Sequence, residues 1–180
     1  MHLKMKFKNL NYLFIIFYLL SSNFSYSIAL PDIKNLIIHK EKKKINNIEF
    51  FNSQSIKVNL NDFSSNLIII NFWATWCAPC KEEMPHLDQL KLDKDFKNIE
   101  IIPINISDEN LKKSKDFFKE LNISNLEVFY GPSIEMAKEF KLRGIPTTIF
   151  IDKDGYEFAR VVGFVNFKNK SFMDWLNKYL

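Results

Sequence analysis

Residues Trp73-Ala74-Thr75-Trp76-Cys77-Ala78-Pro79-Cys80 carry both cysteines of the chain and join a predicted strand to a predicted helix. The preceding run Leu67-Ile68-Ile69-Ile70 is apolar at every position, which is typical of a strand that is buried on both faces. The residues from Pro79 onward have the pattern of a helix. We therefore expect both thiols at a strand-to-helix turn.

Two cysteines separated by two residues lie one turn apart on a helix, close enough to form a disulfide. Cys77 would lie nearest to the unpaired backbone N–H groups and to the positive end of the helix dipole, which both favour a thiolate. A lowered pKa makes Cys77 the attacking sulfur, and Cys80, one turn inside the helix, is then the resolving thiol. The spacing predicts redox chemistry.

Two structural roles compete with this interpretation. A structural disulfide between Cys77 and Cys80 would close a ring of only four residues, which stabilises a fold by about 2 kcal/mol before any strain. A zinc site needs two further ligands, and the only histidines outside the first few residues are His39 and His86. Redox exchange is the interpretation that we adopt.

Two separate stretches make the chain similar to a known family. The first, Asn71-Phe72-Trp73-Ala74-Thr75-Trp76-Cys77-Ala78-Pro79-Cys80-Lys81-Glu82-Glu83-Met84-Pro85, resembles the thioredoxin superfamily, and specifically its exported TlpA/ResA-like thiol-disulfide oxidoreductases. The second, Gly144-Ile145-Pro146-Thr147-Thr148, resembles the family's cis-proline loop. The resemblance implies an α/β thioredoxin-like fold over residues 48–180, with a central mixed sheet flanked by helices, an N-terminal β-hairpin and a strand–helix insert.

Three residues are candidate substrate-binding residues, Trp76 from its position beside Cys77, and Ile145 and Pro146 from the resemblance. Trp76, next to the nucleophile, would cover the thiolate and offer apolar surface to a partner, whereas Trp73 suits core packing. Ile145 and Pro146 would form the loop whose free backbone groups pair with an extended substrate chain. The cis bond before Pro146 is an expectation from the resemblance alone.

Glu83 is the candidate proton acceptor for the resolving thiol. Thioredoxins usually place a buried aspartate at the position of Asn71, and the cytochrome-maturation branch typically has glutamate where this chain has Thr147. An amide cannot take the proton, but Glu83 projects about 60° from Cys80, inside the apolar stripe of the helix. Burial there should raise its pKa and let it exchange a proton with Cys80, unless the helix rotates Glu83 into water. Asn71→Ala is expected to leave the pH dependence unchanged.

The length of 180 residues, with 47% hydrophobic and 26% charged residues, suits one domain with a buried core. Residues 1–27 have the layout of a signal peptide or an N-terminal anchor, with a basic start, an apolar stretch and a small-x-small site at Ser25-x-Ser27. The apolar stretch is about half of the roughly 20 residues that span a bilayer, which favours cleavage near Ser27 over an anchor. Residues 28–47 are predicted to be a solvated linker.

Charge and compartment restrict the partners. Three of the 25 basic residues lie in residues 1–27, which leaves 22 against 21 acidic residues, and no stripe of basic and aromatic side chains indicates nucleic-acid binding. An exported pair would be oxidised unless a reductant is supplied. The sequence has no Gly-rich dinucleotide motif, so we expect a membrane dithiol protein as electron donor. We expect no metal, and no cofactor beyond the redox-active disulfide Cys77–Cys80.

The remaining elements follow from periodicity and turn residues. The expected elements are a hairpin of Ile48–Phe51 with Ser55–Leu60, a strand over Ile99–Ile106, an amphipathic helix presenting Leu111, Phe118 and Leu121, a strand over Leu126–Tyr130, a helix capped by Ser133 and ending at Phe140, paired strands Thr147–Ile151 and Tyr156–Val162 with Gly155 in their turn, and a closing helix with Phe172, Trp175, Leu176 and Tyr179.

These observations predict a periplasmic or extracytoplasmic thiol-disulfide oxidoreductase, secreted or attached to the inner membrane through its N-terminus. It would exchange Cys77–Cys80 with cysteines of exported proteins. The family implies reduction, as in cytochrome c maturation or copper-site assembly. One alternative is a disulfide-forming oxidant, for which Ala78-Pro79 supplies no histidine to stabilise a thiolate. The other is a non-catalytic copper-carrying or chaperone module with the same fold.

Overall fold

The fold is described by a computed structural model, which covers residues 31–180 apart from residues 32, 46–47 and 108. The predicted signal peptide or anchor in residues 1–27 lies outside the described residues. The part from Pro31 to Leu180 forms a single unit.

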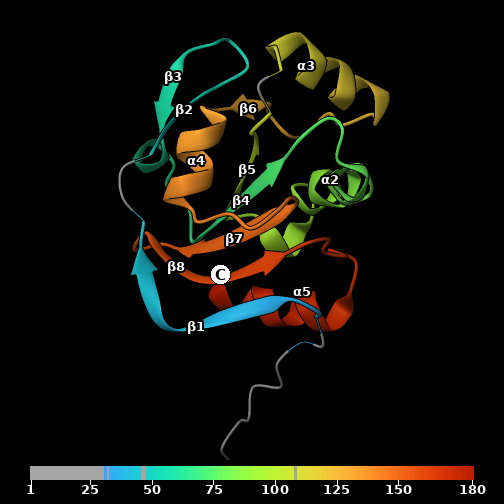
Figure 1. Cartoon of the computed structure of the whole chain (residues 1–180). Helices are drawn as coiled ribbons and strands as arrows, with labels where there is room; N and C mark the ends of the chain where they lie inside the picture. The colour runs from blue at the N-terminus through green and yellow to red at the C-terminus, as the bar shows by residue number, and fades with distance from the viewer. Residues whose placement is uncertain (1–30, 32, 46–47, 108) are drawn as a thin grey trace, which may run out of the picture. The chain divides into compact units, whose positions relative to one another are not determined.

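Within this part, the strands form one mixed sheet in the order β1-β8-β7-β4-β5-β6-β2-β3 (Figure 1). β4 runs parallel to β5 and antiparallel to β7, and all of its residues are buried. Its continuous apolar sequence therefore reflects a central strand that is covered on both faces. The strands are β1 (Leu36–Lys44), β2 (Glu49–Phe51), β3 (Lys57–Asn59), β4 (Leu67–Trp73), β5 (Ile99–Asn105), β6 (Phe129–Tyr130), β7 (Thr147–Asp152) and β8 (Tyr156–Val162).

Helices cover both faces of the sheet (Figure 1). One core joins the sheet to α2, α3 and α5 through Met84, Phe117 and Trp175, and the other joins it to α4 through Met136 and Phe140. The predicted mixed sheet flanked by helices is confirmed. The helices are α2 (Ala78–Leu90), α3 (Leu111–Glu120), α4 (Ser133–Glu139) and α5 (Lys170–Leu176), with short 3-10 helices at Leu60–Asp62, Lys94–Phe96 and Asn177–Tyr179.

The strand register determines where the loop that carries Cys77 and the loop that carries Pro146 lie. Phe72, near the end of β4, pairs with Thr147, the first residue of β7. Because these strands are antiparallel, the loop that leaves β4 and the loop that enters β7 lie at the same edge of the sheet. The fold therefore brings the Cys77 loop and the Pro146 loop to one edge.

Two turn-level predictions are confirmed. The N-terminal hairpin is present, with Glu49 of β2 paired to Asn59 of β3. Gly155, between β7 and β8, has a φ of 79°, the left-handed conformation that favours glycine.

The prediction of a linker over residues 28–47 is wrong for Leu36–Lys44. These residues form β1, which pairs antiparallel with β8. β1 is an edge strand of the sheet, and its lysines discourage pairing with another chain. A charged edge strand lacks the apolar pattern that makes a strand recognisable in sequence, which explains the error.

Two boundaries also differ from the sequence-based expectation. The strand predicted over Leu126–Tyr130 is restricted to Phe129–Tyr130, where the chain reaches β5 and β2. Pro132 is the N-cap of α4 and Ser133 is its first residue, so the predicted serine cap is wrong. A proline before the helix has a fixed φ of about −65°, which suits this boundary without a side-chain cap.

Candidate active site

Cys77 and Cys80 form a disulfide at the start of α2. Cys77 is the N-cap residue, and the Cys80 backbone N–H donates a hydrogen bond to its Sγ at 3.3 Å. Cys77 and Cys80 are 4% and 1% exposed, whereas Ala78 and Pro79 between them are exposed. After reduction, the same N–H and the helix dipole would favour a thiolate on Cys77.

A tight turn precedes the disulfide and presents Trp76. The Cys77 N–H donates to the Ala74 carbonyl at 3.2 Å, which places Thr75 and Trp76 at the centre of the turn. Trp76 is 70% exposed and available to a partner. Trp73 is fully buried, with its ring centroid 4.5 Å from that of Phe117. The two tryptophans thus occupy the surface and core positions that were predicted.

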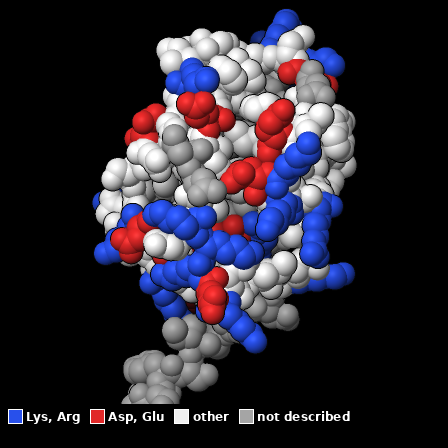
Figure 2. Space-filling model, turned by 60° about the vertical axis from the view of Figure 1, so that its left-hand side comes forward, with Lys and Arg blue, Asp and Glu red and all other residues white. Residues whose placement is uncertain are grey.

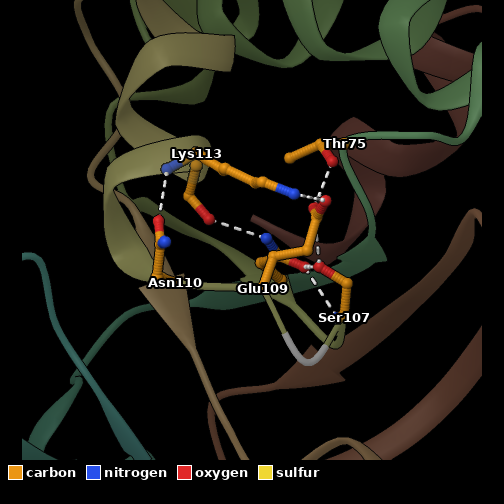
Figure 3. A network of polar contacts seen from close by, with 7 residues as sticks. Thr75, Ser107, Glu109, Asn110 and Lys113 are labelled. Carbon is orange, nitrogen blue, oxygen red and sulfur yellow. Dashed lines mark hydrogen bonds and ion pairs between the residues drawn. The ribbon is translucent and has the colours of Figure 1, made fainter.

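A polar network holds this turn against the loop before α3 (Figure 3). The Thr75 hydroxyl donates to Glu109 Oε2, and Ser107 Oγ donates to the same oxygen at 3.1 Å. Lys113 Nζ lies 3.0 Å from Glu109 Oε1. The hydrogen bond from Thr75, followed by that from Lys113, holds the pKa of Glu109 below its ordinary value. Glu109 is therefore an ionised acceptor that fixes the turn carrying Trp76.

Glu83 is buried one turn after Cys80, with 1% of its surface exposed. Its Oε1 accepts hydrogen bonds from Asn71 Nδ2 at 2.6 Å and from Thr148 Oγ1 at 3.1 Å. Its Oε2 accepts from the Val165 backbone N–H at 2.7 Å. Burial raises the pKa of Glu83 to about 7, although the three hydrogen bonds oppose the rise. Near neutral pH, this carboxyl can take up or release a proton one helical turn from Cys80.

The contact between Asn71 and Glu83 contradicts one expectation. Asn71 also donates to Thr148 Oγ1 at 3.0 Å, so it belongs to the buried cluster that surrounds the carboxyl. Its hydrogen bond favours the ionised form of Glu83, and Asn71→Ala should therefore raise the pKa of Glu83 rather than leave the pH dependence unchanged. The signal was present in the sequence, because an amide within an otherwise apolar buried strand needs a polar partner.

The second loop at this edge contains a cis peptide bond between Ile145 and Pro146, as the resemblance implied. Pro146 is buried and Ile145 is half-buried in the oxidised protein. The Pro146 carbonyl accepts a hydrogen bond from Gly163 N–H at 2.8 Å. Thr148, two residues further on, contacts Glu83 and thereby connects this loop to α2. The predicted residues Cys80, Glu83 and Pro146 therefore belong to one connected region.

The histidines of the zinc alternative lie in other clusters. His39 Nε2 is 2.5 Å from Glu157 Oε1, and the His86 ring packs edge-to-face with that of Phe164 at 6.2 Å between centroids. Among the residues that the structure describes, no three His, Cys, Asp or Glu side chains are grouped to hold a metal ion. The helices of the same residues are all too short or too polar to cross a membrane.

The mixed sheet, the Cys-x-x-Cys pair at the start of α2 and the cis-proline loop define a thioredoxin-like protein. The sequence model of the AhpC/TSA family matches residues 42–156, more than half of the chain, and the chain belongs to this family.

Curated relatives and solved structures agree with this assignment. The thiol-disulfide oxidoreductase ResA of Bacillus thuringiensis subsp. konkukian (strain 97-27) is 34% identical over 107 residues, which cover 59% of this chain and 61% of that protein. ResA of Bacillus anthracis is 30% identical over 107 residues, which also cover 59% of this chain and 61% of that protein. The matches thus span about 61% of these relatives. A secreted thiol-disulfide isomerase from Corynebacterium glutamicum shares the fold, with a TM-score of 0.69 at 24% identity over 83% of this chain and 94% of that one.

The raised pKa of Glu83 predicts a pH-dependent stability. Between about pH 4.5 and pH 7, the folded chain keeps a proton on Glu83 that the unfolded chain has released. The free energy of unfolding should therefore fall as pH rises through this window, by roughly 3 kcal/mol from this group, and change no further above it. Urea unfolding of the oxidised protein at several pH values measures this. Glu83→Gln should lack this slope, and Glu82→Gln, which removes an exposed carboxylate from the same helix, should keep it. Equal slopes in wild type and Glu83→Gln would contradict the prediction.

Proposed function

We propose that the protein is a thiol-disulfide oxidoreductase that exchanges its Cys77–Cys80 disulfide with cysteines of exported proteins. The observation that carries this proposal is the disulfide at the N-terminus of α2, connected through Glu83 and Thr148 to the loop of cis-Pro146. A disulfide that closes so short a ring contributes little to stability, whereas its place at a helix start suits exchange. The ResA relatives are named for this chemistry.

The exchange has two steps in which bonds and electrons balance. The Cys77 thiolate attacks a substrate disulfide, forms a mixed disulfide and releases one substrate thiolate. Cys80 then loses its proton and attacks Cys77 Sγ, which closes the disulfide and releases the second substrate thiolate. The substrate gains two electrons and the Cys77–Cys80 pair loses them. Trp76, Ile145 and Pro146 are the proposed contacts for the substrate chain.

We propose reduction as the direction, in an extracytoplasmic compartment, with cytochrome c maturation or copper-site assembly as the setting. A membrane dithiol protein would return electrons to the pair. An N-terminal signal or anchor in residues 1–27 would bring the protein to this compartment. The family resemblance supports the direction, and the composition of residues 1–27 supports the location.

The reduction potential of the Cys77–Cys80 couple tests this function. Full-length protein equilibrated with glutathione or dithiothreitol buffers should give a potential near that of thioredoxin, about −270 mV. A value near −120 mV, as in strong oxidants, would instead indicate a disulfide-forming enzyme. Tight Cu(I) binding combined with slow thiol exchange would indicate a copper carrier and would also overturn the proposal.

A further inference from the structure

A cavity of about 620 Å³ lies between the C-terminal end of α4 and strands β1 and β8. Neither cysteine nor Glu83 lines it. Figure 2 brings the β1 side of the molecule forward and shows Lys and Arg side chains gathered across this face. Six cationic side chains and two carboxylates line the cavity, namely Lys43, Lys44, Lys138, Lys141, Arg143 and Arg160, with Glu139 and Glu157.

The buried acid of this cavity is already neutralised. Glu157 is 1% exposed and receives two hydrogen bonds from Arg160, Nε to Oε1 at 2.5 Å and Nη2 to Oε2 at 2.7 Å. His39 Nε2 lies 2.5 Å from the same Oε1. Burial raises the pKa of Glu157, but Arg160 and His39 outweigh this and hold it below its ordinary value. The carboxylate therefore has no capacity left to compensate the remaining cations.

Four of the described cations are paired with neither Glu139 nor Glu157. Within the part of the chain that the structure describes, Lys43, Lys138, Lys141 and Arg143 form no ion pair and no side-chain hydrogen bond. The excess is local, because basic and acidic residues nearly balance outside residues 1–27. Like charges that converge on a concave, partly apolar surface repel one another and attract anions. This arrangement favours an anionic ligand.

The apolar part of the lining restricts what that ligand is. Five hydrophobic residues also line the cavity, namely Ile37, Ile45, Ile48, Phe140 and Val162. The volume lies within the range of about 300 to 1,000 Å³ that small-molecule sites occupy. A phosphate group offers several acceptor oxygens to several converging cations, whereas an organic body would contact the apolar side chains. We propose that this cavity binds an organic phosphate ester, either a soluble molecule or the headgroup of a membrane lipid.

Two binding assays on the full chain test the proposal and separate the two sources. The soluble arm titrates phenyl phosphate by calorimetry. The membrane arm measures co-sedimentation with phosphatidylcholine vesicles that contain phosphatidic acid, relative to phosphatidylcholine alone, so that any apolar contribution of residues 1–27 cancels. Binding is expected in at least one arm and should weaken as salt increases, because the contacts are ionic.

Matched variants identify the site. Lys138→Gln/Lys141→Gln should weaken binding by on the order of 10-fold for each lost contact. Lys115→Gln/Lys119→Gln removes the same charge from exposed positions on α3 and should change binding by less than about twofold. Lys43→Gln tests the opposite wall of the cavity, on β1, with an independent variant. Thermal unfolding and thiol exchange should be unchanged in all of them.

The two assays and the matched variants distinguish a soluble ligand, a lipid headgroup and general charge attraction. If phenyl phosphate binding weakens in the cavity variants but not in Lys115→Gln/Lys119→Gln, the ligand is a soluble phosphate ester. If vesicle binding weakens in the same pattern, the ligand is a lipid headgroup. Equal losses in both lysine pairs would mean general charge attraction and would overturn the proposal. The absence of binding in both arms would also overturn it. The thiol exchange of Cys77–Cys80 is measured separately, so neither result depends on the proposed redox function.

Discussion

Cys80→Ser should accumulate a mixed disulfide between Cys77 and a substrate cysteine, whereas Cys77→Ser should form no adduct. Cys77 is the N-cap of α2, and its sulfur accepts a hydrogen bond from Cys80 N–H, so the attacking thiolate belongs at position 77. Serine at position 80 cannot attack the mixed disulfide, and the adduct should persist. Each substitution should abolish multiple turnover, the largest effect that we expect in this protein.

Non-reducing electrophoresis and intact mass distinguish the two variants. Each is reduced, freed of reductant and mixed with a substrate made of two identical peptides joined by one disulfide. Cys80→Ser should gain the mass of one peptide, and dithiothreitol should remove it. The double variant, with both cysteines replaced, is the control for adventitious binding. An adduct with Cys77→Ser and none with Cys80→Ser would reverse the roles of the two thiols.

Glu83→Gln should slow the resolving step by on the order of 10²-fold, the lower end for general acid–base catalysis. The carboxyl is buried one turn after Cys80, and its pKa of about 7 suits proton uptake near neutral pH. The rate of resolution in wild type should rise as pH increases through about 7, because the ionised carboxylate is the base. Glu83→Gln should lose this inflection.

Asn71→Ala tests the same buried cluster in a second way, because it should shift the pH inflection of the resolving step and not remove it. The substitution removes the 2.6 Å hydrogen bond that favours the ionised carboxylate, so the inflection should move to higher pH without disappearing. Glu82→Gln is the matched control, because it removes an exposed carboxylate from the same helix. Stopped-flow measurement of the decay of a preformed mixed disulfide checks all three variants. A wild-type profile in Glu83→Gln would show that water or another group takes the proton.

Much of the fold followed from local sequence. The apolar run from Leu67 is buried as β4, and the cysteines lie where a buried strand meets a helix. Glu83 lies inside the apolar stripe of α2 because helical periodicity alone determines which face it shares with Cys80. These predictions succeeded because continuous apolar runs and a period of 3.6 residues are properties of neighbouring residues.

Other features had no local signal. The strand β1 carries a lysine-rich sequence, and only its pairing with β8 makes it part of the sheet. Thr75 and Glu109 are 34 residues apart, and no pattern at either position indicates their contact. The same holds for the cavity, whose cations come from β1, from the end of α4, from the loop after α4 and from β8.

The two kinds of information differ in physical origin. Burial and secondary structure depend on the pattern of apolar residues along a segment, so the chain itself specified β4, α2 and the position of the thiols. The partners of polar groups depend on which segments meet when the sheet closes. Asn71, Thr148 and Val165 surround Glu83 because β4, β7 and the loop after β8 converge on α2. Only that packing makes the carboxyl a buried group with a pKa of about 7, since desolvation and hydrogen bonding arise from neighbours that are distant in sequence.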